Sequence, residues 1–142
     1  MIDQSVSDVM KHSARTITEE TTASTVARLF AENGIGSAVV VDPETDDLLG
    51  IVTDSDIMQQ VATGADITAV AVGSFMTTPV ITINSTESID TAATLMRDHS
   101  IRRLPVVDDD DLVGILTTTD LTHYLPRLRN AILRTRNELD GQ

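Results

Sequence analysis

The chain has 142 residues and a formal net charge of -12, a length that suits one compact module or two small units sharing a core. The absence of cysteine excludes disulfides and thiolate metal sites, and the few basic residues disfavour nucleic acid as the main partner, because phosphate binding needs Lys and Arg. No apolar run approaches the roughly 20 residues of a membrane helix and no signal pattern opens the chain, so we expect a soluble, cytoplasmic protein that does not enter the membrane.

The first half of the chain predicts a short strand, a helix, a two-stranded hairpin and a second helix. The short strand lies at residues 16–17, and the GIGS of residues 34–37 is expected to stop the helix that follows it. β-Rich segments at residues 38–41 and 48–52 flank the polar run DPETDD, which suits a hairpin, and a short helix begins directly afterwards. The first helix is marked by an apolar set at helical spacing: Ala23, Val26, Ala27 and Phe30.

The second half repeats this pattern at an offset of 66 residues. VSDVM at residues 6–10 aligns with VGSFM at residues 72–76, and the register continues without a gap through the helix and the next strand. Two residues then drop out of the hairpin loop, so that LLGIVTDSDI meets LVGILTTTDL at residues 112–121. Agreement at so many positions indicates a duplicated unit. The helix of the second copy carries Ile89, Ala92, Leu95 and Met96, and its hairpin strands are residues 104–107 and 112–116.

Each copy is too small to bury its own apolar face, so we expect the two copies to pack on each other. The predicted fold is α+β, with two tandem repeats of strand, helix, strand, strand and helix related by pseudo-twofold symmetry. The first repeat covers residues 1–66 and the second residues 67–125.

Both copies contain a threonine at the end of the returning strand, three residues before an aspartate. Thr53 with Asp56, and Thr117 with Asp120, have the spacing of a helix N-cap followed by an acid in the first helical turn. This interpretation needs no ligand. The same geometry also suits one, because an aspartate accepts hydrogen bonds from the two hydroxyls of a ribose and a helix N-terminus favours phosphate.

These features resemble the CBS domain pair, also called a Bateman module, from Val6 to about Leu125. The features quoted for the resemblance occur twice and in order: the VxxxM opening, the apolar helix, the (L/A)(P/V)VVD strand, and GI(V/L)T followed by xxD. The resemblance implies a regulatory module, not an enzyme. It also implies flat homodimers and binding of AMP, ADP, ATP or S-adenosylmethionine in clefts between the two copies, with an unidentified partner protein reading the bound state.

By the same resemblance, Asp56 and Asp120 hold ribose hydroxyls, while Thr53 and Thr117 contact phosphate or ribose. The adenine of one site lies near residues 14–16, which include Thr16, with Ala38. The adenine of the other site lies near five residues of the second copy: Val80, Ile81, Thr82, Leu104 and Pro105.

The two copies differ in charge beside these positions. Many CBS family members carry an arginine or lysine inside TxxD, whereas here the intervening pairs are DS in the first copy and TT in the second. Arg102 and Arg103 precede the second LPVVD strand, where the first copy has Gly36 and Ser37. We therefore expect the second site to take phosphorylated nucleotides. The alternative is a solvent-facing pair of arginines that balances nearby acids.

Several other patterns carry no catalytic or metal prediction. The acidic run at residues 108–111 lacks the spacing of an EF-hand loop and is better explained as a hairpin turn. The three histidines lack the spacing of a zinc site, and no nucleophile and base can be assembled into a catalytic set.

The alternative to ligand sensing is a structural dimerisation module in which TxxD only caps helices.

The segment at residues 126–142 differs from both repeats. Pro126 can open a helix whose apolar positions lie on one face, with four arginines elsewhere. We expect this helix to pack on the acidic surface or across a dimer interface. A docking helix for an acidic partner or for nucleic acid is the alternative.

Folding that depends on high salt is predicted from the acidic surface. Asp far outnumbers Glu, Lys11 is the only lysine and aromatic residues make up 2%, a composition that resembles proteins of salt-in halophiles. Screening of carboxylate repulsion should raise the melting temperature as KCl increases toward molar concentrations. Full stability in dilute buffer would contradict this prediction and favour the other explanation, an anionic surface for a cationic partner.

Overall fold

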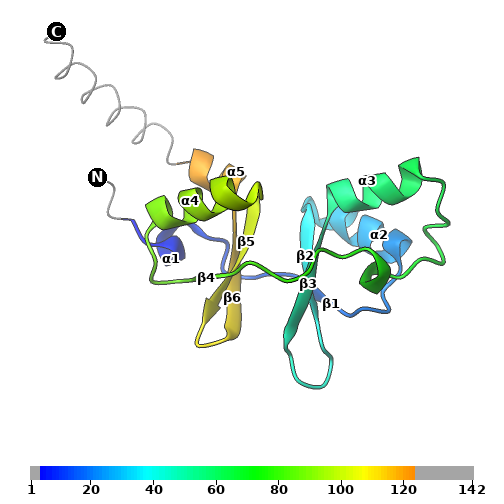
Figure 1. Cartoon of the computed structure of the whole chain (residues 1–142), viewed down its shortest axis with the longest axis horizontal. Helices are drawn as coiled ribbons and strands as arrows, with labels where there is room; N and C mark the ends of the chain where they lie inside the picture. Colours follow the sequence, from blue (N-terminus) through cyan, green and yellow to red (C-terminus); the bar gives the residue numbers. More distant parts are fainter. Residues whose placement is uncertain (1–3, 124–142) are drawn as a thin grey trace, which may run out of the picture. The chain divides into compact units, whose positions relative to one another are not determined.

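The computed structural model describes residues 4–123 (Figure 1). The predicted helix at residues 126–142 lies outside the described residues. The chain forms two compact units, each with one three-stranded sheet. One unit consists of residues 14–81, and the described part of the other combines residues 4–13 with 82–123. The predicted α+β class and the order strand, helix, strand, strand and helix in each copy are confirmed.

In the unit of residues 14–81, β2 is the central strand of the sheet. It pairs in parallel with β1 on one side and antiparallel with β3 on the other. The parallel pair is joined through α2, the crossover connection that parallel strands require. The elements of this unit are β1 (Thr16–Ile17), α2 (Ala23–Asn33), β2 (Ser37–Val41), β3 (Leu48–Thr53), α3 (Asp54–Ala62) and the 3-10 turn η1 (Val72–Ser74).

The other unit repeats this topology with β5 at the centre of its sheet. β4 pairs with β5 in parallel, and β6 pairs with β5 antiparallel. The 66-residue register is kept in the strand pairing, since Ile17 lies opposite Val40 and Ile83 lies opposite Val106. The elements are α1 (Val6–Val9), β4 (Ile83–Asn84), α4 (Ile89–His99), β5 (Arg103–Asp108), β6 (Asp111–Thr117) and α5 (Thr118–Thr122).

The two long helices begin and end through equivalent local signals. The Thr22 hydroxyl accepts the Thr25 N–H at the start of α2, and the Ser88 hydroxyl accepts the Thr91 N–H at the start of α4. α2 ends at Gly34, whose φ of 61° is left-handed, so the predicted helix stop at GIGS is confirmed.

The acidic run of residues 108–111 forms a tight hairpin turn, as predicted. Asp108 pairs with Asp111, and the two aspartates between them have φ of 47° and 73°. Positive φ at both central residues is the geometry that matches the twist of a two-residue hairpin, and Asp tolerates it better than most residues.

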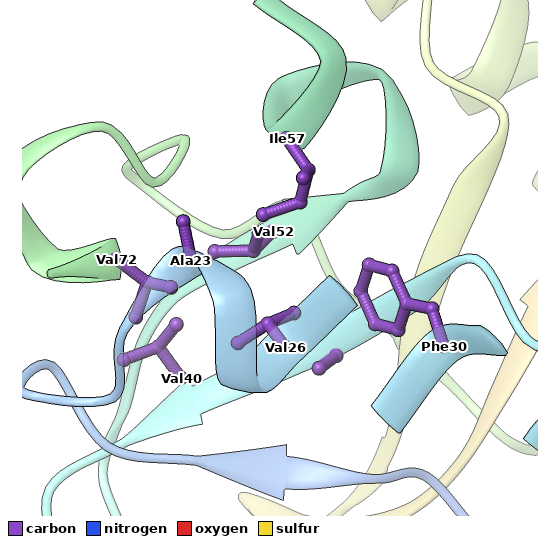
Figure 2. Packing of buried hydrophobic residues seen from close by; sticks show 8 residues of the cluster. Ala23, Val26, Phe30, Val40, Val52, Ile57 and Val72 are labelled. Carbon is purple, nitrogen blue, oxygen red and sulfur yellow. The ribbon is translucent and has the colours of Figure 1, made fainter. Parts of the chain in front are cut away.

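The apolar face of α2 packs on its sheet, as the helical spacing predicted. Ala23, Val26 and Phe30 lie against Val40 of β2 and Val52 of β3 (Figure 2). Burying a side chain of this size stabilises a fold by about 1.5–3 kcal/mol relative to exposure, so this face holds the helix in place. Three further buried residues complete the cluster: Ala38, Ile57 and Val72.

The opening segments VSDVM and VGSFM each dock on the sheet of the other copy. Val6 N–H donates to Glu87 O and Lys11 pairs with Ile115 through both backbone groups, at N···O distances of 2.9 and 3.0 Å. In the other unit, Val72 N–H donates to Thr21 O and Thr77 pairs with Ile51 in the same way. The compact units therefore do not follow the order of the copies along the chain.

Two glycines allow this close approach. A Cβ at Gly114 would overlap Lys11 O and would lie 2.8 Å from Met10 Sδ. At Gly50 the nearest atom would be Met76 Sδ at 2.6 Å, with Thr77 O at 3.0 Å. The glycine of each GI(V/L)T phrase is thus explained by the segment that crosses it.

None of the helices in residues 4–123 combines the length and the apolar character needed to cross a bilayer.

Gly114→Ala is expected to destabilise the protein by about 1–3 kcal/mol, because the added methyl meets backbone that must shift. Gly50→Ala is the matched control and should cost less, because a flexible methionine tip is the nearest obstacle. Chemical denaturation of both variants measures the difference. Equal losses, or a larger loss at Gly50, would contradict the assigned contacts.

Candidate functional site

The two TxxD sequences lie where a strand passes directly into a helix. We call Thr53 to Asp56 the first junction and Thr117 to Asp120 the second junction. Thr53 ends β3 and caps α3, and Thr117 ends β6 and caps α5. The backbone before each junction is also equivalent, because the first helical N–H donates to Gly36 O in one unit and to Arg102 O in the other.

Each junction is closed by a reciprocal pair of hydrogen bonds. The Thr53 hydroxyl accepts Asp56 N–H at 3.3 Å, and Asp56 Oδ2 accepts Thr53 N–H at 2.8 Å. At the second junction the corresponding distances are 3.1 and 2.9 Å. The predicted N-caps are therefore confirmed, as capping boxes. One oxygen of each carboxylate is held toward the backbone, which fixes where the other oxygen points.

The candidate residues of the first copy gather at one end of their sheet. Ser37 lies opposite Thr53 and Ala38 lies opposite Val52 in the β2–β3 ladder. Thr16 is the first residue of β1 and pairs with Val39, the neighbour of Ala38. Thr16 is exposed, whereas Ala38 is buried. Thr16, Ala38 and Thr53, which the sequence assigned to adenine and ribose contacts, therefore lie at the same end of this sheet.

The second copy repeats the arrangement, with an arginine at the equivalent end of its sheet. Arg103 is half-buried and lies opposite Thr117, where the first copy has Ser37 opposite Thr53. Leu104 pairs with Leu116, and Thr82 directly precedes β4. Arg102 is exposed. Of the adjacent pair Arg102 and Arg103, only Arg103 lies in register with the junction.

Other predicted contacts are less accessible or belong elsewhere. The Leu104 and Pro105 side chains are fully buried, so their apolar surface is already packed. Val80 and Ile81 are half-buried and belong to the compact unit of residues 14–81, directly before the chain enters the other unit at Thr82. The assignment of these residues to ligand contacts stays a prediction.

The second junction contains a residue that sequence reasoning did not assign to it. Lys11 Nζ lies 2.5 Å from Asp120 Oδ1, and the lysine side chain is 56% exposed while that of Asp120 is 5% exposed. The lysine reaches this position because its own backbone pairs with Ile115, two residues before Thr117. The sequence shows that Lys11 is the only lysine and directly follows the VSDVM opening, but it contains no signal that connects Lys11 with Asp120.

At the first junction the residue equivalent to Lys11 is uncharged. Thr77 occupies the position that Lys11 has in the other unit, with the same backbone pairing to Ile51. Asp56 is half-buried and bonds to Thr53, and Asp54 adds a second carboxylate where the second junction has Thr118. The two junctions are alike in backbone and opposite in local charge.

Within the described chain, no group of three His, Asp or Glu side chains is arranged to hold a metal ion. At the two junctions the structure shows the capping hydrogen bonds and the Lys11–Asp120 ion pair.

The family model for the CBS domain matches residues 6–63 and 72–127. The chain belongs to the CBS domain family. The resemblance deduced from the repeated phrases is thereby confirmed, and both junctions fall inside the matched ranges.

Relatives and solved structures agree with this assignment. An uncharacterized protein of Methanopyrus kandleri, MK0525, is 37% identical over 126 residues, which are 87% of this chain and 64% of that protein. The CBS domain pair of MJ0100, solved with 5′-methylthioadenosine and S-adenosyl-L-methionine, is 27% identical with a TM-score of 0.79, covering 88% of this chain and 98% of that one. The CBS domain protein PAE2072 of Pyrobaculum aerophilum, solved with AMP, is 29% identical with a TM-score of 0.77, covering 83% and 90%.

Thr117→Ala should reduce stability by about 1 kcal/mol, because the Asp120 N–H loses its cap. Thr117→Ser is the matched control and should remain close to the parent protein, since the hydroxyl is retained. Urea denaturation measures both variants. A serine variant as unstable as the alanine variant would show that the methyl group matters instead of the cap.

Proposed function

We propose that this CBS domain pair is a regulatory ligand sensor that binds adenosine-containing compounds at its two strand-to-helix junctions. The proposal rests on the way in which the fold orients the carboxylates of Asp56 and Asp120. Each carboxylate is fixed by a capping box and keeps acceptor capacity, because an ionised carboxyl group offers about four lone-pair sites.

A ribose diol matches this arrangement chemically. Two adjacent hydroxyls donate well to one carboxylate, and a carboxylate that is already oriented loses little freedom when it binds. The ligands of MJ0100 and PAE2072 share an adenosine moiety, which supports the same ligand class here. AMP, ADP, ATP and S-adenosylmethionine are the candidate ligands.

The second junction is the better candidate for phosphorylated ligands. Arg103 is in register with Thr117, and Lys11 compensates the charge of Asp120. The first junction carries Asp54 and Asp56, whose charges repel a phosphate. Its expected ligand is an uncharged or cationic adenosine compound.

A regulatory role follows if a partner protein distinguishes the occupied from the empty state. A ligand shifts such an equilibrium only by its differential affinity for the two states, so the partner must bind one of them better. The homodimer, the cytoplasmic location and the identity of the partner stay predictions.

A dimerisation module without ligand is the second candidate. Met58 and Val61 on α3 are 71% and 57% exposed, and their spacing places them on the same helix face. Exposed apolar residues of this size suit a contact with another protein surface. In this alternative the junction aspartates serve only as helix caps.

Isothermal titration of the purified chain in molar KCl with AMP, ADP, ATP and S-adenosylmethionine tests the proposal. Asp120→Ala is expected to weaken nucleotide binding by about 10-fold or more, because hydrogen bonds to a charged group contribute about 1.5–3 kcal/mol. Asp56→Ala is the matched control and should leave nucleotide binding at the second junction intact.

Melting curves of both variants must accompany the titration, since each substitution also removes a capping partner. If folded parent protein binds none of the four ligands, the sensor proposal is wrong and the dimerisation module is favoured.

A further inference from the structure

The two junctions differ most at one residue, which comes from the opening segment of the other copy. Lys11 and Thr77 have the same backbone partners, with Ile115 in one unit and Ile51 in the other. Only the first of them carries a charge. The duplicated fold therefore delivers a cation to one junction and a neutral hydroxyl to the other, at equivalent positions.

The charges around the junctions consequently have opposite balance. The second junction has Lys11, Arg103 across the ladder and one carboxylate, Asp120. At the equivalent positions the first junction has Thr77 and Ser37 with Asp56. Asp54 adds a further negative charge directly after Thr53.

Lys11 can serve a ligand without releasing Asp120. An ammonium group has three N–H donors and one of them points to Asp120 Oδ1, while the lysine side chain remains 56% exposed. Asp120 Oδ2 accepts Thr117 N–H, so each oxygen of this 5% exposed carboxylate keeps lone-pair capacity for one more donor. The pair therefore combines acceptors for two hydroxyls with donors for one anionic group.

A 5′-phosphorylated nucleoside presents those three groups. Its diol and its phosphate are attached to the same sugar, so a carboxylate that binds the diol is close enough to repel the phosphate. The Lys11 ammonium removes this repulsion and can also donate to a phosphate oxygen. Without such a cation, the carboxylate favours a ligand that lacks the phosphate.

We propose that Lys11 is a specificity-determining residue that makes the second junction select 5′-phosphorylated adenosine ligands over the uncharged nucleoside. Thr77 leaves the first junction to ligands without a phosphate. This inference rests on the proposed binding of adenosine compounds at the junctions.

The test is the ratio of AMP affinity to adenosine affinity, measured by isothermal titration at one fixed KCl concentration. Lys11→Met keeps much of the side-chain length and removes the charge, so the ratio is expected to fall about tenfold, mainly through weaker AMP binding. Lys11→Arg is the matched control and should keep the ratio within about threefold of the parent. A melting curve of each variant confirms that it is folded.

A role of Lys11 limited to holding the opening segment gives a different result. In that case Lys11→Met lowers the melting temperature, but AMP and adenosine affinities change by the same factor, and the inference is overturned. If the parent protein binds neither compound, the proposed function itself fails. The two failures are therefore distinguishable.

Thr77→Lys provides a second route that does not disturb the Lys11 ion pair. In an Asp120→Ala background, where the second junction is disabled, the new lysine should raise AMP affinity at the first junction by about tenfold over the same background with Thr77. Thr77 is exposed, so the longer side chain can be accommodated. Unchanged AMP binding in this variant would contradict the assigned selectivity.

Discussion

Two short backbone bridges, between Lys11 and Ile115 and between Thr77 and Ile51, hold each opening segment on the sheet of the other copy. The bridges need a residue without a side chain at Gly114 and Gly50, because the crossing backbone or methionine would otherwise collide with a Cβ. They also determine which side chain arrives next to each junction. The ion pair between Lys11 and Asp120 exists because of this exchange.

The capping and binding interpretations of TxxD are compatible. The hydrogen bond from the threonine N–H fixes one carboxylate oxygen. Because the carboxylate is already oriented, it loses less conformational entropy when a ligand binds its other oxygen. A residue that stabilises the start of a helix thus also prepares an acceptor of known direction. Local stability and ligand recognition use the same two residues.

Much of the fold could be predicted from the sequence, because its signals are local or repeated. The apolar spacing of Ala23, Val26 and Phe30, the helix stop at Gly34 and the turn at residues 108–111 each follow from short-range chemistry, and the structure confirms them. The 66-residue register survives in the pairing of β1 with β2 and of β4 with β5. The same register aligned the residues of the two junctions, whose backbones are equivalent in the structure.

The partner of Asp120 could not be predicted in this way. Lys11 and Asp120 are 109 residues apart and meet only because an opening segment leaves its own copy, and no local pattern encodes such an exchange. The aligned copies suggested that VSDVM belongs with the residues that follow it. Tertiary hydrogen bonding to Ser85, Glu87 and Ile115 places it instead beside the second copy.

The exchange also bears on how a duplicated chain of this kind can be divided. A single copy cut at its sequence boundaries would contain an opening segment whose docking strand is missing, and a strand next to Gly50 that nothing crosses. Neither backbone bridge of the full chain could form within such a copy. The covalent link between the repeats keeps each opening segment near the strand on which it docks, so in the full chain both bridges are intramolecular and independent of protein concentration.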